Sequence, residues 1–255
     1  MRKYFKYFLY LYVFIGYSLS NAGSYDDFIA AVTFDQPVTI ERLLARGFDP
    51  NTVSEKGVPG ILVALQAESS QSAMVLAKHP STNVNAQNTA GETPLMLAAI
   101  NNNLALAKLL IERGADVNKT GWTPLHYAAT RGHRDMMRLL LENDAYIDSE
   151  SAGGTTPLMM AAKFGTPLAV KLLLEEGADP VLTDHENASA LDMASKADKQ
   201  QSVFYLQAFI ESWFIQNPTV EEIPEKNSLN SAMNWDDPRR CAQTSGMSLR
   251  KCNVK

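Results

Sequence analysis

Cysteine is scarce in this chain of 255 residues, and the two that are present, Cys241 and Cys252, lie within its last fifteen residues. Two thiolates without a neighbouring histidine cannot complete the four-ligand set of a structural zinc site, so we expect no zinc site there. In an oxidising compartment the two cysteines could form a disulfide, whereas in a reducing compartment they stay free thiols. The sequence leaves both alternatives open.

Aromatic and charged residues are also sparse, at 9% and 20% of the chain, against 45% hydrophobic residues. This composition excludes a membrane-embedded body and global disorder, and it is typical of soluble folded domains. Residues 1–22 hold three of the 23 basic residues and none of the 28 acidic ones, so residues 23–255 carry a net charge of −8. Because that part has no cluster of Lys and Arg, we expect no nucleic-acid binding.

Signatures of catalysis are missing as well. The chain has no HExxH, GxSxG or glycine-rich phosphate-binding motif, and no cysteine is followed by a suitable histidine partner. Its four histidines are scattered over the chain at His79, His126, His133 and His185. The sequence therefore predicts no enzyme activity, no metal and no cofactor; the alternative is an unrecognised active site on a repeat scaffold.

The first 22 residues differ in character from the rest. A basic start over residues 2–6 is followed by an apolar stretch over residues 7–19 and by small residues at 20–22. This order is that of a secretory signal peptide cleaved after Ala22. An uncleaved membrane anchor is the competing interpretation, but the apolar stretch is shorter than the roughly 18 to 20 residues that span a bilayer.

What the chain does have is an internal repeat. Residues 91–99 read GETPLMLAA, residues 121–129 read GWTPLHYAA and residues 154–162 read GTTPLMMAA, at offsets of 30 and 33 residues. A second phrase alternates with the first, reading AKLLIERGADVN over residues 107–118 and VKLLLEEGADP over residues 170–180. Two phrases that alternate at this spacing indicate a repeat architecture.

These phrases resemble the ankyrin-repeat family, whose unit of about 33 residues holds a turn, two helices and the motif T-P-L-H-x-A. Three units are clear over residues 83–182, and the resemblance extends over roughly residues 24–215. It implies an all-α fold, an ankyrin-repeat solenoid of about five stacked helix-turn-helix units joined by short β-hairpin-like loops.

Each part of the repeated phrases has a physical reason. Proline fits the first turn of a helix, and the preceding Thr side chain can accept a hydrogen bond from an unpaired backbone N–H. The Ala-Ala pair keeps the helix thin, so that the next unit can approach closely. Gly114 and Gly177 end the second helices in a left-handed conformation.

Weaker copies extend the array in both directions. Residues 23–56 are expected to form an N-terminal capping helix pair, residues 57–182 the ankyrin repeats and residues 183–215 a C-terminal capping repeat. Residues 216–255 are polar and rich in Pro, with little periodic apolar spacing. We expect this tail to be mostly disordered, with a small disulfide-closed fold as the alternative.

The resemblance also implies where a partner would bind, because ankyrin arrays bind through their loop tips and the concave face of their first helices. Trp122, Arg131 and Phe164 rank first, since Trp and Arg are favoured at hot spots and an exposed Phe costs solubility unless it is used. The alternative is that Trp122 covers the adjacent hairpin and Phe164 packs under the next loop. The other candidate positions are Thr89, Glu92, Ile100, Asn101, Thr130, Thr155, Lys163 and His185.

Two departures from the motif bear on these positions. His126 occupies the His position of the motif, where the resemblance implies a structural role, and two sister units have Met96 and Met159 there. The loop before Gly121 is short, because only Lys119 and Thr120 separate it from Asn118. That shortening opens a notch beside Trp122 or is a neutral deletion, and the sequence does not decide between them.

A signal peptide followed by such an array resembles the periplasmic ankyrin proteins of Gram-negative bacteria. That resemblance implies a monomeric, non-enzymatic module of the cell envelope that binds, protects or inhibits a partner protein and is not inserted in the membrane after cleavage. Two alternatives remain, an extracellular effector that binds a host protein and a scaffold tethered by residues 4–19. The partner and the pathway lie beyond the sequence.

Cleavage of residues 1–22 predicts a mature protein that begins at Gly23. Intact-mass spectrometry of the protein purified from its native cells is the measurement. A mass that retains the Met1 end would support the membrane anchor instead.

Overall fold

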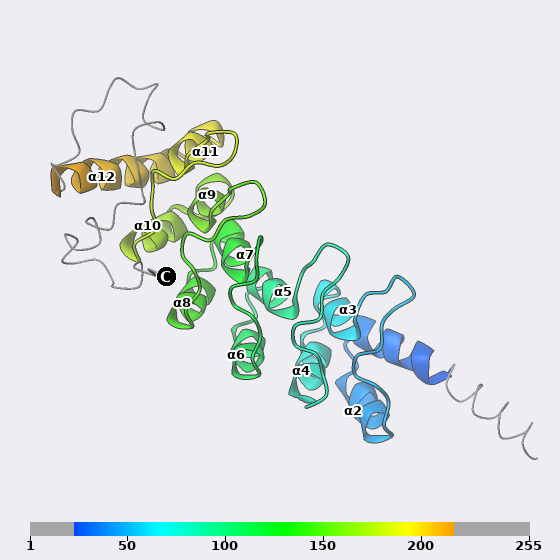
Figure 1. The fold of residues 1–255 in the computed structure, drawn as a ribbon. Coiled ribbons are helices and arrows are strands. Elements are labelled where there is room, and N and C mark those ends of the chain that lie inside the picture. The colour runs from blue at the N-terminus through cyan, green and yellow to red at the C-terminus, as the bar shows by residue number, and fades with distance from the viewer. Residues whose placement is uncertain (1–22, 217–255) are drawn as a thin grey trace, which may run out of the picture. The chain divides into compact units, whose positions relative to one another are not determined.

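The computed structural model describes residues 23–216, drawn as coloured ribbon in Figure 1. The signal peptide expected over residues 1–22 and the cysteines Cys241 and Cys252 lie outside the described residues. The expected tail lies outside them too, apart from Gln216, at which the last helix ends.

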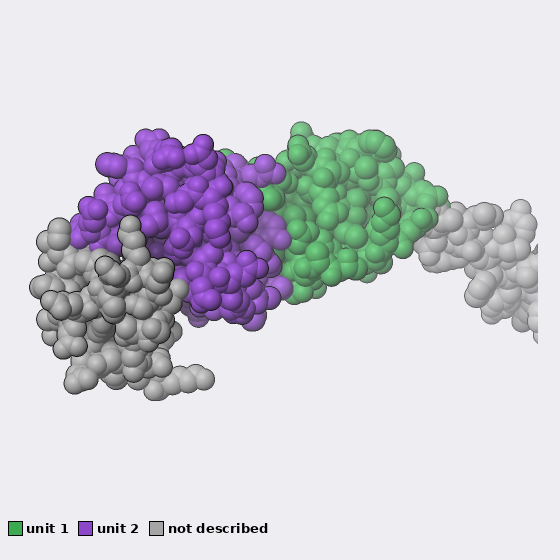
Figure 2. All heavy atoms as spheres, turned by 90° about the horizontal axis from the view of Figure 1, so that it is seen from above, with its two compact units in different colours: residues 1–116 green, residues 117–255 purple. Residues whose placement is uncertain are grey.

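The chain divides into two compact units, residues 1–116 and residues 117–255, coloured separately in Figure 2. Unit 1 contains helical residues 23–33 followed by α2 (Pro37–Ala45), α3 (Gly60–Gln66), α4 (Ser70–Lys78), α5 (Pro94–Ile100) and α6 (Leu104–Glu112). Unit 2 contains α7 (Pro124–Arg131), α8 (Arg134–Glu142), α9 (Pro157–Lys163), α10 (Pro167–Glu175), α11 (Ala190–Lys196) and α12 (Gln200–Gln216). Within the described residues the extended pairing is limited to two isolated bridges, so the all-α class is confirmed.

The first helix of each clear repeat begins where the sequence predicts. Helices α5, α7 and α9 all start at a proline, preceded by a buried threonine in extended conformation. In α5 and α9 the threonine hydroxyl accepts the backbone N–H of the third helical residue, at 3.4 Å. These bonds satisfy a donor that the helix itself leaves unpaired.

Close stacking of successive first helices depends on small residues. Both alanines of the repeated phrase are buried in α5, α7 and α9. Helix α7 packs against α9 and α9 against α11, whereas the second helices α8, α10 and α12 pack against one another in the same order. Gly165 shows how tight this packing is: a β-carbon there would lie 2.9 Å from the backbone of Ala161 and would overlap the carbonyl oxygen of Ala129.

The loops that lead into the first helices are narrow and hydrogen-bonded. In the loop before α5, Gly91 N–H donates to the carbonyl of Asn88 at 2.9 Å and Asn88 N–H to that of Glu92 at 3.2 Å. The loop before α9 repeats this pair between Ser151, Gly154 and Thr155. The expected β-hairpin-like loops are therefore confirmed.

Side chains in these loops also bind the backbone of the following loop. In unit 1, Asn85 donates to the carbonyl of Gly114 at 3.1 Å and accepts the N–H of Asp116 at 2.8 Å. In unit 2, Asn118 donates to the carbonyl of Asp144 and accepts the N–H of Tyr146, both at 2.7 Å. We call this arrangement the loop clamp.

Gly165→Ala tests the close packing, and we expect it to lower the free energy of unfolding by about 2 kcal/mol, because the methyl group meets backbone atoms that cannot rotate away. Gly153→Ala is the matched control, since a β-carbon there has one neighbour within 4 Å, the Ser151 hydroxyl at 3.9 Å. Urea unfolding of both variants is the measurement. Equal midpoints would contradict the packing argument.

Candidate functional site

The predicted tip residues of unit 2 are joined by a chain of contacts. The Trp122 ring is 41% exposed and packs edge-on against His126, with ring centroids 5.2 Å apart, and against Tyr127 at 6.4 Å. The neighbouring loop contributes Thr155, whose carbonyl oxygen lies 2.9 Å from His126 Nε2. Trp122 thus stands on a support that hydrogen bonds hold in place.

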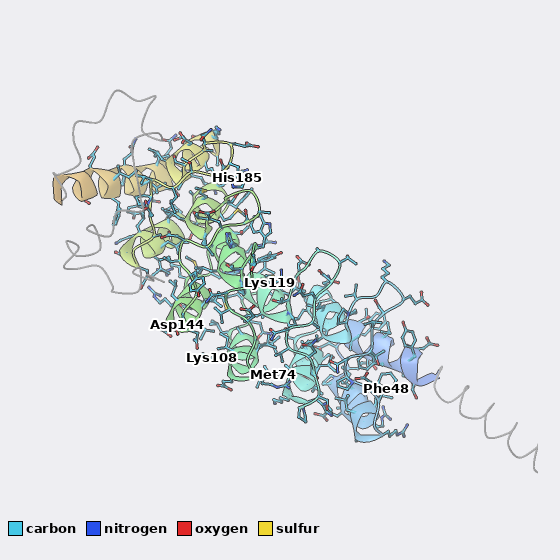
Figure 3. All side chains as sticks on the ribbon, viewed as in Figure 1. Phe48, Met74, Lys108, Lys119, Asp144 and His185 are labelled. Carbon is cyan, nitrogen blue, oxygen red and sulfur yellow. The ribbon has the colours of Figure 1, made fainter. Side chains whose placement is uncertain are left out.

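His185 belongs to the same series of loops, and Figure 3 labels it on the loop between α10 and α11. Its backbone N–H donates to the carbonyl of Gly153 at 3.0 Å, so two successive loop tips are bonded to each other. A β-carbon on Gly154 would lie 2.8 Å from the His185 ring, which therefore packs directly on that glycine. The imidazole itself is exposed.

His126 carries most of this support. Because Thr155 offers a carbonyl oxygen, His126 Nε2 must carry the proton and donate, which leaves Nδ1 to accept the N–H of Thr123 at 3.2 Å. Burial lowers the pKa of His126 from 6.5 to about 4, and the bond to Thr155 opposes this shift. A second proton on Nδ1 would face a backbone donor, so the folded protein holds this imidazole neutral.

The methionines of the sister units replace only half of this arrangement. Met96 and Met159 each accept the N–H of the capping threonine through sulfur at 3.4 Å. A thioether has no donor, so neither can make the bond that His126 makes to the next loop. The structural role that the motif implies for His126 is thus the link between two loops.

The predicted residues at the ends of the first helices form a second group in unit 2. Arg131, Lys163 and Phe164 are exposed, and Phe164 retains 52% of its surface. Lys163 Nζ lies 5.0 Å from the centre of the Phe164 ring, within cation–π range. Thr130 is half-buried and bonds the carbonyl of His126 within its own helix. Phe164 therefore does not pack under the next loop.

In unit 1 the predicted residues are more occupied by internal contacts. Asn101 donates to the carbonyl of Leu65 at 2.9 Å and so caps the end of α3, and Glu92 accepts from Asn88 at 2.7 Å. Thr89 is exposed at its loop tip, and Ile100 is half-buried. The freer surface of the predicted set lies in unit 2.

Several exposed residues were missed by sequence reasoning. Leu168 is 46% exposed beside Phe164, and Phe34 and Val38 occupy the corresponding positions of unit 1 with 72% and 71% exposed. Tyr146 is exposed after α8. No motif marks these positions, and Phe34, Val38 and Leu168 could be found only by aligning the turns between paired helices.

Within residues 23–216, no three His, Cys, Asp or Glu side chains are placed to hold a metal ion. In the same part of the chain, no helix has the length and apolar character required to cross a membrane. Two buried side-chain atoms there lack a hydrogen-bond partner, His79 Nδ1 and Ser202 Oγ, and they belong to different units.

Comparison with known families settles the class of this scaffold. The family model "Ankyrin repeats (3 copies)" matches residues 28–120, 63–151 and 117–184, which together cover more than half of the chain. The chain belongs to the ankyrin-repeat family. Ankyrin repeats are protein-binding modules, and their fold is in general a non-enzymatic scaffold.

Curated ankyrin-repeat relatives are much longer than the part that matches this chain. The chain is 33% identical over 144 residues to ankyrin repeat and SAM domain-containing protein 6 of Rattus norvegicus, covering 56% of this chain and 13% of that protein. It is 31% identical over 174 residues to ankyrin repeat and KH domain-containing protein mask-1 of Caenorhabditis elegans, covering 67% and 6%. The chain thus spans a small part of these relatives.

Solved ankyrin-repeat structures resemble the fold over 71% of this chain. The human ASB11 ankyrin repeat domain matches with a TM-score of 0.65 and 27% identity, over 82% of its length. An ankyrin repeat domain from Acinetobacter baumannii matches with a TM-score of 0.62 and 25% identity, over 96% of its length. A third match is a chain from the complex of a predatory endopeptidase of Bdellovibrio bacteriovorus with an immunity protein. Its TM-score is 0.62 and its identity 26%, over 97% of its length.

The pKa of His126 predicts a loss of stability at mildly acidic pH. The group's pKa is lowered on folding, so the unfolded chain binds more protons between pH 6.5 and about 4, and stability falls as the pH drops through that window. When the pH is lowered from 7.5 to 5, we expect the free energy of unfolding of the wild type to fall by about 2 kcal/mol more than that of His126→Met, because methionine does not titrate. Urea unfolding of both proteins at the two pH values measures the difference. Parallel losses would contradict it.

Proposed function

We propose that this chain is an exported protein of the bacterial cell envelope that binds a partner protein and catalyses no reaction. The observation that carries the proposal is Trp122, an exposed aromatic ring held on the His126–Thr155 link and therefore presented without a large ordering cost. Rigid aromatic anchors of this kind dominate protein interfaces. The binding surface comprises the tips around Trp122 and the helix ends around Phe164.

Inhibition or protection is the role that the comparisons support best. A chain of similar fold occurs in the complex of a predatory endopeptidase with an immunity protein, in a bacterium. We infer by analogy that the partner here is an envelope enzyme such as a hydrolase, bound as a monomer after residues 1–22 are removed. The periplasm is the proposed compartment.

A secreted effector that binds a host protein is the second candidate, favoured by the eukaryotic origin of the curated relatives. Fractionation separates the two candidates. Release of the protein by osmotic shock supports the periplasmic proposal, whereas recovery from the culture medium supports the effector.

Partner capture tests the surface itself. Crosslinking pull-downs from envelope extracts would compare wild type with Trp122→Ala and, separately, with Arg131→Ala combined with Phe164→Ala. We expect a specific partner to be captured by wild type and reduced about tenfold or more by Trp122→Ala, which removes a central anchor.

Tyr146→Ala is the matched control, because it deletes another exposed aromatic ring of unit 2 outside the predicted set. Its capture should equal that of wild type, and all variants should melt cooperatively before they are compared. If Trp122→Ala and Tyr146→Ala capture the partner as wild type does, the surface is misassigned.

A further inference from the structure

The turns between paired helices in unit 2 are positively charged, although the chain as a whole is acidic. Residues 131–135, 163–168 and 196–201 form the three turns, and each carries a net charge of +1. The loops at the other end of these helices, residues 117–123, 147–156 and 180–190, together hold four carboxylates and one cation, Lys119. The two ends of the helices in unit 2 therefore differ in sign.

The cations of the turns are not neutralised within the described part of the chain. Its ion pairs join Arg138 to Asp135 at 3.3 Å and Lys171 to Glu175 at 3.5 Å. The other acid of the turns, Asp198, accepts from Gln200 at 2.7 Å. The cations of these three turns are Arg131, Arg134, Lys163, Lys196 and Lys199, and none of them is in the ion pairs of residues 23–216. Four of them are exposed and Lys199 is half-buried.

Two apolar side chains lie in the middle of these cations. Phe164 and Leu168 belong to the central turn and retain 52% and 46% of their surface. The first turn lies directly beside it, since a β-carbon on Gly132 would meet the Thr166 side chain at 2.7 Å. The third turn follows because α9 packs against α11. We call the five cations together with Phe164 and Leu168 the basic edge.

We propose that the basic edge binds an acidic segment of the partner protein that carries a bulky apolar side chain. This inference rests on the proposed function and specifies the partner's chemistry. Carboxylates along such a segment would pair with cations on three successive turns, and its apolar side chain would cover Phe164 and Leu168. An acidic protein segment fits better than an anionic membrane, because two half-exposed side chains offer little apolar area for insertion.

Charge reversal on the basic edge provides the test. The probe is a fluorescent peptide of about fourteen residues in which Glu alternates with Leu and Ser, measured by anisotropy with the full chain. We expect binding that weakens with salt and falls about tenfold in Lys163→Glu combined with Lys196→Glu. Lys78→Glu combined with Lys108→Glu, exposed lysines of unit 1, changes the net charge equally and should bind within about twofold of wild type.

A second comparison tests whether the apolar side chain of the peptide contributes to binding. Leu168→Ser should weaken binding of the Leu-containing peptide but leave unchanged the binding of a peptide with Ser at every Leu position. Equal loss in both lysine pairs would overturn the proposal, since only net charge would then matter.

Other occupants of the edge would also overturn the proposal. One such outcome is binding to vesicles of anionic lipid without binding to the peptide. Another is peptide binding that appears only after Glu221, Glu222 and Glu225 are changed to Gln, because the chain's own acidic segment would then be the occupant. If partner capture depends on Trp122 but not on Lys163 and Lys196, this inference fails while the proposed function stands.

Discussion

The loop clamp is the interaction on which the candidate surface depends. A stack of short helices is held together by apolar burial, which has no direction of its own. The clamp adds direction, because one asparagine side chain donates to and accepts from the backbone of the next loop, as Asn118 does with Asp144 and Tyr146. Figure 3 labels Asp144 just after α8, where the second helix of that repeat ends. Loops fixed in this way can present Trp122 in a constant geometry, and the bond from the His185 N–H to Gly153 joins the next loop tip to them.

His126 adds a second link of the same kind, nearer to the tips. It joins the capping threonine of one repeat to the loop of the next, and the apolar surroundings keep it neutral. The sister repeats have Met96 and Met159 at this position. Both side chains are buried and accept from the capping threonine, but they make no hydrogen bond to the loop of the next repeat. The repeat that carries the exposed tryptophan is thus also the one whose loop is tied most firmly to its neighbour in unit 2.

Much of the fold could be predicted from the sequence, because its determinants are local. Thr-Pro fixes the start of a helix, Ala-Ala permits close stacking, and Gly114 and Gly177 do adopt left-handed conformations with φ of 83° and 92°. None of the eleven candidate positions is buried, so each has some surface that a partner could reach.

The contacts that distinguish one exposed position from another could not be predicted. The sequence gives no sign that Asn101 has a structural partner, yet its side chain donates to the carbonyl of Leu65 and caps the end of α3. The basic edge escapes the sequence for a related reason: Gly132 is left-handed in the first turn and Asp198 in the third, whereas no residue of the central turn has a positive φ. Without a constant glycine, cations in different repeats cannot be aligned by eye.

The position of the clamp within its loop has a consequence for how such arrays can change. Asn118 lies before the point at which its loop is shorter than the loop that precedes α5. Its bonds to Asp144 and Tyr146 are therefore made even though the loop tip is short. The residue that fixes the loop to its neighbour is therefore distinct from the residues that form the exposed tip. A change of length or chemistry between Asn118 and Gly121 therefore leaves every partner of the clamp in place.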